Sequence, residues 1–206
     1  MELFILSFLL KLLITGALWW AMTRSASTRR LWGLLAAGWT VNLLGDVAWG
    51  VHDQLFETAL PPLSWLDVLY VARYLLIGLA FWTYPTRWPH RHLWQVAGTM
   101  ALAALIAWVA FYQPVLAATD RSWAYFAGLA LYPILDAGLV YVAWIRYRRQ
   151  DQNKKVLLVL FLSTISYSIA NLINFGTRMA SPGADSLLAN LLWLGSDLLA
   201  GAALIY

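Results

Sequence analysis

Ionisable and amide side chains interrupt several long apolar segments of this sequence, and they are the residues best suited to chemistry. Asn42 and Asp46 are four residues apart, which places both on one face of a helix. Polar and charged side chains are costly in hydrocarbon, so each one inside a membrane segment is a functional candidate. The candidate ligand-binding residues are Asp46, Asp67, Tyr70, Arg73, Tyr74, Asp136, Asn171, Asn190 and Asp197.

These candidates contain more acidic than basic groups. Four of them are aspartates, whereas the basic groups inside the apolar segments are Arg73 and Lys11. About two carboxylates are therefore expected to be protonated, hydrated or bound to something else. Lys11 is expected either to reach the membrane surface through its long side chain or to pair with Asp197 or Asp136.

The positions of Asp46, Asp67 and Arg73 predict that these three residues contact one another. A short hairpin joins their two helices, and the aspartates are about equally far from its turn. Two interpretations stay open. The polar groups can be helix clamps, each hydrogen bond contributing about 0.6 kcal/mol, or they can line a cavity that binds a ligand.

Several other chemistries find no support in the sequence. There is no cysteine, which excludes disulfides, thiolate catalysis and cysteine-ligated zinc. The histidines His52, His90 and His92 fall at predicted helix ends or in loops, where they do not form a haem or metal site within the bundle. The last apolar segment has no lysine for a retinal Schiff base. We predict no metal site, and a cofactor stays unassigned.

The composition predicts a single all-α membrane domain over residues 1–206. Hydrophobic residues make up 62% of the chain and charged residues 12%, far from the values of soluble domains. Apolar runs recur at the length that a bilayer requires, with prolines at their boundaries (Pro61, Pro62, Pro85, Pro89, Pro114 and Pro182). We expect a polytopic bundle of seven transmembrane helices near 3–23, 31–51, 63–84, 93–113, 124–147, 154–176 and 186–206.

The distribution of basic residues predicts the orientation. Ten of the 14 lysines and arginines fall in the first, third and fifth connections, which are therefore expected in the cytoplasm. The N-terminus is then outside, the C-terminus is cytoplasmic, and the candidate residues line a polar cavity open to the outside. The net charge of +4 comes from these short clusters, so we expect a multi-pass protein of the inner (plasma) membrane and no nucleic-acid partner.

Several apolar motifs resemble the seven-helix membrane input domain that precedes PAS, GGDEF and EAL modules in bacterial cyclic-di-GMP signalling proteins. The residues that carry the resemblance are 44–57, 61–70 with Tyr74, 132–136 and 191–200. The sequence departs from the family at Asn171 and Asn190, where acidic residues are usual. The last apolar run ends at Tyr206 without a basic flank, so we expect either a continuation of the chain or a bare membrane module, and cyclase activity is not implied.

Three functions are compatible with these features. The first is a sensory input module that couples a small ligand or a membrane signal to a cytoplasmic output domain or partner, with a homodimer also allowed. The second is a membrane-embedded lipid hydrolase that uses paired aspartates such as Asp46 and Asp67. The third is a structural or pigment-associated subunit, which the 13 tryptophans permit, although an interfacial aromatic belt explains many of them. We favour the first.

Overall fold

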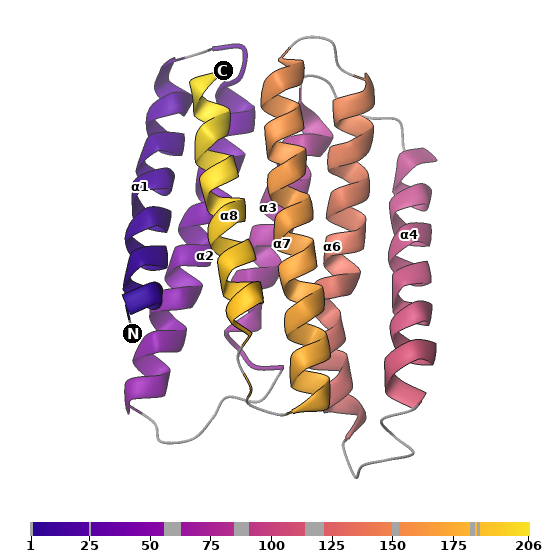
Figure 1. Ribbon diagram of the computed structural model, residues 1–206. Helices are drawn as coiled ribbons and strands as arrows, with labels where there is room; N and C mark the ends of the chain where they lie inside the picture. Colours follow the sequence, from indigo (N-terminus) through magenta and orange to yellow (C-terminus); the bar gives the residue numbers. More distant parts are fainter. Residues whose placement is uncertain are drawn as a thin grey trace.

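The computed structural model describes residues 2–24, 26–55, 63–84, 91–113, 122–149, 153–181, 184 and 186–206. Within these ranges the chain is all-α, with seven long helices (Figure 1). They are α1 (Glu2–Arg24), α2 (Arg29–Leu55), α3 (Asp67–Thr83), α4 (Arg91–Ala107), α6 (Trp123–Arg149), α7 (Lys154–Ala180) and α8 (Leu187–Ala202). A π-helical turn, η1 (Trp108–Tyr112), continues α4, and a 3₁₀ turn, η2 (Ala203–Ile205), continues α8.

The all-α class and the seven expected helices are confirmed. The largest difference at a helix start is in α3, which begins at Asp67 and not near residue 63. The Asp67 carboxylate accepts the backbone N–H of Ser64 at 2.5 Å, which holds the preceding residues in a turn. The six boundary prolines lie outside the described residues.

Six of the described helices are long and apolar enough to cross a bilayer. The exception is α3, which has 17 residues and is therefore about 25 Å long, somewhat less than the hydrocarbon thickness. Large apolar side chains such as Leu75 and Trp94 stand 67% and 80% exposed on the outside of the bundle, a surface suited to lipid. The chain is thus a multi-pass helical membrane protein.

Six helices form a closed ring, and one packs outside it. Each helix in the order α1, α2, α3, α6, α7, α8 contacts the next, and α8 returns to α1. The main packing partner of α4 is α6, and Figure 1 shows α4 at the edge of the bundle. The ring therefore encloses the polar faces of six helices. Helix α4 covers part of the outer side of α6.

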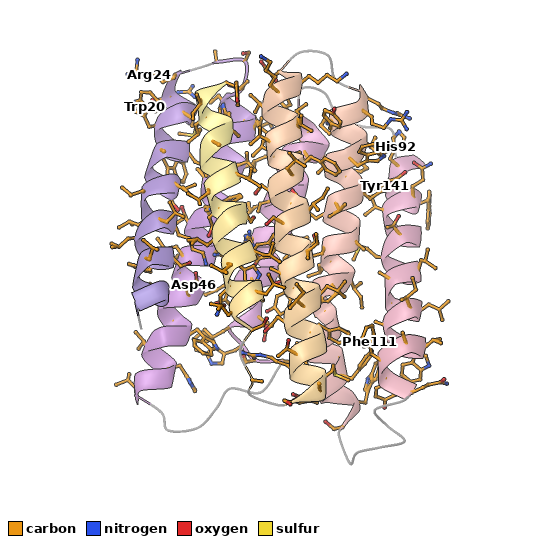
Figure 2. All side chains as sticks on the ribbon, viewed as in Figure 1. Trp20, Arg24, Asp46, His92, Phe111 and Tyr141 are labelled. Atoms are coloured by element: carbon orange, nitrogen blue, oxygen red, sulfur yellow. The ribbon has the colours of Figure 1, made fainter. Side chains whose placement is uncertain are left out.

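The two ends of the bundle differ in charge. The end of α1, the start of α2, the end of α6 and the start of α7 meet at one end (Figure 1), which we call the basic end. It carries Arg24, Arg29, Arg30, Arg148, Arg149, Lys154 and Lys155. Figure 2 places Arg24 and His92 at this end, and Asp46 toward the opposite one, which we call the far end.

Candidate functional site

An ion pair links α1 to α2. The Lys11 ammonium lies 2.6 Å from the Asp46 carboxylate, and both side chains are largely buried. Asp46 also accepts the Tyr70 hydroxyl at 3.0 Å and the Asn42 amide at 3.4 Å, so the predicted helical face of Asn42 and Asp46 is confirmed. Lys11 thus pairs with Asp46 of α2, and we find no ion pair of Lys11 with Asp197 or Asp136 among the described residues. Its reach to the membrane surface stays a prediction.

Asp67 joins α3 to α6 at the far end. Its carboxylate accepts the Tyr132 hydroxyl and, from Ser64, the backbone N–H and the side-chain hydroxyl. Its place at the start of α3 also lets the helix dipole stabilise its charge. The ring of Tyr132 meets Tyr70 edge to face, with the centroids 6.2 Å apart, and so connects Asp67 to the Asp46 cluster.

Arg73 does not make the predicted contact with Asp46 and Asp67. Within the described residues we find no hydrogen bond or ion pair between its guanidinium and either carboxylate, so that prediction is wrong. The guanidinium instead stacks 3.7 Å above the ring of Tyr167, and Arg73 is 4% exposed. The reason is helical geometry: Arg73 is six residues after Asp67, which at 3.6 residues per turn turns it about 120° away.

A buried carboxylate joins four helices near the middle of the bundle. Asp136 of α6 accepts the Tyr74 hydroxyl of α3 at 2.9 Å and the Asn171 amide of α7 at 2.7 Å. The Asn171 carbonyl in turn accepts the indole N–H of Trp193 on α8 at 2.9 Å. The structure therefore brings together three of the predicted residues, Tyr74, Asp136 and Asn171.

A second buried carboxylate, Asp197, lies on α8 with 1% exposure. Its Oδ1 atom accepts the indole N–H of Trp39 at 3.2 Å, and its Oδ2 atom has no hydrogen-bond partner among the described residues. The Arg73 guanidinium is 5.4 Å from the centroid of the same indole. The Nε atom of Arg73 is also buried, and it has no hydrogen-bond partner in the described part of the chain.

Asn190 is the predicted residue that lies apart from the others. It is in the first turn of α8 and is partly buried. We find no side-chain hydrogen bond for it within the described ranges. The remaining residues form what we call the polar network: Lys11, Trp39, Asn42, Asp46, Asp67, Tyr70, Arg73, Tyr74, Tyr132, Asp136, Tyr167, Asn171, Trp193 and Asp197.

Carboxylates outnumber their close cationic partners in the polar network, as the sequence predicts. In the described residues, Lys11 and Asp46 are the ion pair that we find. Asp67, Asp136 and Asp197 accept hydrogen bonds from neutral hydroxyl, amide and indole groups. Hydrogen bonds from neutral donors offset only part of the desolvation cost of a buried carboxylate.

Several network residues were not among the candidates, although helical spacing contains the signal. Tyr132 precedes Asp136 by four residues, and Trp193 precedes Asp197 by four, so each pair shares a helix face. Trp39 is seven residues before Asp46 and belongs to the same stripe. Aromatic residues are common in membrane helices for packing, so only their position on a polar stripe distinguishes these three.

Two cavities adjoin the polar network. A small one of about 20 Å³ lies beside Arg73 and has the hydroxyl residues Ser163, Thr164, Tyr167 and Ser196 in its lining. That volume is sufficient for one water molecule. A larger one of about 540 Å³ lies over α6 and has Asp136 in its lining. The predicted cavity open to the outside beside Asp46, Asp67 and Asn190 coincides with neither, and it stays a prediction.

No family model, no curated protein and no solved structure matches this chain. The resemblance to the input domains of cyclic-di-GMP signalling proteins therefore stays an expectation from the sequence motifs. A function is best inferred from the polar network itself, from its charges and from the helices that it joins.

Proposed function

We propose that the chain is a sensory membrane module in which the polar network responds to a small ligand or a membrane signal by changing how the helices pack. The observation that carries this proposal is the set of buried carboxylates held by neutral donors from neighbouring helices. Asp136, for example, accepts one hydrogen bond from α3 and one from α7. A ligand that alters one such carboxylate would alter the relative energy of two helix packings, which is all that a signal requires.

Helix adhesion alone would not need carboxylates in this bundle. The contact between α7 and α8 is made by small hydroxyl residues: Ser163 donates to the Ser196 carbonyl at 2.8 Å, and Ser166 donates to the Leu192 carbonyl at 2.8 Å. Such groups hold helices together at low desolvation cost. The carboxylates of Asp136 and Asp197 are far costlier to bury, which supports a role beyond packing.

The path of α8 offers a route to an output. Trp193 and Asp197 are in the network, and the same helix continues to the basic end. There Gly201 lies so close to α1 that a Cβ on it would stand 3.3 Å from the Ile14 side chain. We propose that the basic end faces the cytoplasm of a cell with this protein in its inner membrane, and that displacement of α8 reaches an output domain or partner protein there.

The two other functions have less support from the geometry. A hydrolase with paired aspartates would need Asp46 and Asp67 to act on one substrate, yet each is engaged by different groups, Lys11 and Tyr132. For a pigment-associated subunit, the larger cavity does have the aromatic residues Tyr141, Trp144 and Phe161 in its lining, but the buried indoles of Trp39 and Trp193 donate their N–H groups to network residues.

Distance measurements between spin labels test the sensor proposal directly. The sequence has no cysteine, so Arg148→Cys and Ile205→Cys place one label at the end of α6 and one beyond α8. In the full chain reconstituted in vesicles, we expect two distance populations. Asp197→Asn should change their ratio while the protein stays folded, because the neutral amide favours a different packing of α8.

The matched control for this experiment is Leu198→Ala, at the neighbouring, 53% exposed position of the same helix. It should leave the ratio unchanged. The same variants can be assayed with a grafted cytoplasmic output domain, whose response Asp197→Asn should abolish. If Asp197→Asn lowers thermal stability in detergent but changes neither the distances nor the output, the carboxylates are structural clamps and the proposal is wrong.

A further inference from the structure

The larger cavity is a groove on the side of the bundle, which we call the lateral groove. Its floor is α6, from Pro133 to Trp144, and its walls include Thr99 of α4 and Ile169 of α7. At 1.5 Å per residue this floor is about 16 Å long, roughly half the thickness of the hydrocarbon core. The volume of about 540 Å³ is within the range of ligand sites in proteins.

The lateral groove opens toward lipid and is mainly apolar. Trp144, Ile169 and Leu172 line it and are among the exposed apolar residues of the bundle surface. Figure 1 shows α4, α6 and α7 next to one another, with α4 at the edge. An occupant would therefore enter sideways from the bilayer, as a long apolar molecule.

Polar atoms at the inner part of the groove are hydrogen-bond acceptors. The Asp136 carboxylate already accepts bonds from Tyr74 and Asn171, and ionised carboxylates have several further lone pairs. The Ser168 hydroxyl has one proton, which goes to the Thr164 carbonyl at 2.9 Å or to the neighbouring Asp136 carboxylate, and its oxygen keeps lone pairs that can accept a further hydrogen bond. A molecule that binds in the lateral groove next to these acceptors is therefore expected to supply a hydrogen-bond donor.

We infer that the lateral groove binds a long-chain alcohol from the bilayer, with its chain along α6 and its hydroxyl group donating to Asp136 or Ser168. A neutral hydroxyl meets the acceptors without the cost of carrying a charge to the middle of the membrane. The inference rests on the proposed function, since it names the class of ligand that would reach the polar network through Asp136. Binding would add a donor to the carboxylate that joins α3, α6 and α7.

Photolabelling of the full chain in vesicles tests this site. The probe is hexadecanol with a photoactivatable diazirine in its chain, and the comparison probe is the methyl ether of the same molecule, which has no donor. We expect labelling of α6 and α7 peptides by the alcohol, displaced by unlabelled hexadecanol. The alcohol should bind roughly fivefold more tightly than the ether, the effect of one hydrogen bond.

Two variants and a control locate the binding. Ala137→Trp fills the floor of the groove and should abolish labelling there, whereas Leu198→Trp, on the lipid-facing side of α8, should not. Asp136→Asn should reduce the preference for the alcohol over the ether. If Asp136→Asn does not fold, Ala137→Trp still decides whether the labelled site is the groove.

Equal labelling by the alcohol and the ether, or labelling that Ala137→Trp leaves unchanged, would show ordinary lipid contact and overturn the inference. The sensor proposal fails separately. If no specific labelling occurs but Asp197→Asn still changes the spin-label distances, the ligand class is wrong and the sensor stands. If labelling is specific but the distances never change, the groove binds the alcohol without signalling.

Discussion

The interior of the helix ring differs sharply between its basic end and the part that contains the polar network. At the basic end, Leu18, Leu31, Leu35, Phe81 and Leu157 are completely or almost completely buried against one another. Toward the far end the same ring encloses carboxylates, an ion pair and a stacked guanidinium. Close-packed apolar side chains resist repacking, whereas a polar network can offer its donors and acceptors more than one set of partners. The comparison therefore suggests that a change in helix packing begins at the polar network, and that the basic end, to which α8 carries the change, is the more tightly packed of the two.

Two buried arginines of the described residues, Arg73 and Arg146, make the same contrast. Arg146, at the basic end, donates to the Phe81 carbonyl at 2.6 Å and to the Trp82 carbonyl at 2.8 Å, where α3 ends. A cation at the C-terminal end of a helix satisfies free carbonyls and the helix dipole. Arg73 instead stacks on Tyr167 and leaves its Nε without a hydrogen-bond partner in the described residues. Arg146 therefore caps the C-terminal end of α3, whereas Arg73 has a buried N–H donor with no hydrogen-bond partner among the described residues.

The largest expected effect concerns which side of the membrane each end faces. A reporter active only in the cytoplasm should give full signal after Tyr206 and none in the connection at Glu57, because basic residues are retained in the cytoplasm. Residue 57 lies outside the described residues, so this insertion position for the reporter is chosen from the sequence alone. The opposite pattern would place the basic end outside and reverse the proposed direction of signalling.

The next largest effect should come from the apolar end. Phe81→Ala is expected to lower the free energy of unfolding by about 3–5 kcal/mol, since it opens a cavity where the side chain is 1% exposed. Unfolding titrations with a denaturing detergent measure this loss. Leu75→Ala, at a 67% exposed position of the same helix, is the control and should cost far less. Equal losses in both variants would contradict the idea of a tightly packed end.

Removal of one charge from the ion pair should have an intermediate effect. Lys11→Met leaves the Asp46 carboxylate without its cation, and we expect the free energy of unfolding to fall by roughly 1–3 kcal/mol. The double variant Lys11→Met with Asp46→Leu should recover most of that loss, because no charge is then left unpaired. A double variant less stable than Lys11→Met would mean that Asp46 is needed for packing with Tyr70 and Asn42.

The smallest effect is expected at the far end. Tyr132→Phe removes the hydroxyl that donates to Asp67 and keeps the ring that packs on Tyr70 and Tyr74. A single hydrogen bond between membrane helices contributes about 0.6 kcal/mol, so the unfolding midpoint should shift only slightly. Tyr147→Phe is the control, since its ring stacks on Phe161. A loss of several kcal/mol at Tyr132 would show that the far end is as rigid as the basic end.

The helices and the shared faces of their polar residues follow from local patterns in the sequence. Apolar length and the four-residue spacing of polar groups are local properties, and they predicted the seven helices and the common face of Asn42 and Asp46. The excess of carboxylates over cations inside the apolar segments could also be predicted from the sequence, because it depends on which residues those segments contain and not on how they pack.

Which polar groups meet depends instead on how the helices pack against one another. Lys11 pairs with Asp46, Arg73 stacks on Tyr167, and Asp136 is held by Tyr74 and Asn171 because each helix has its own rotation and depth in the bundle. A rotation of about 100° per residue means that a small error in helix phase selects a different partner. The exclusion of α4 from the ring, and with it the lateral groove, likewise depends on how distant helices pack, which no local pattern encodes.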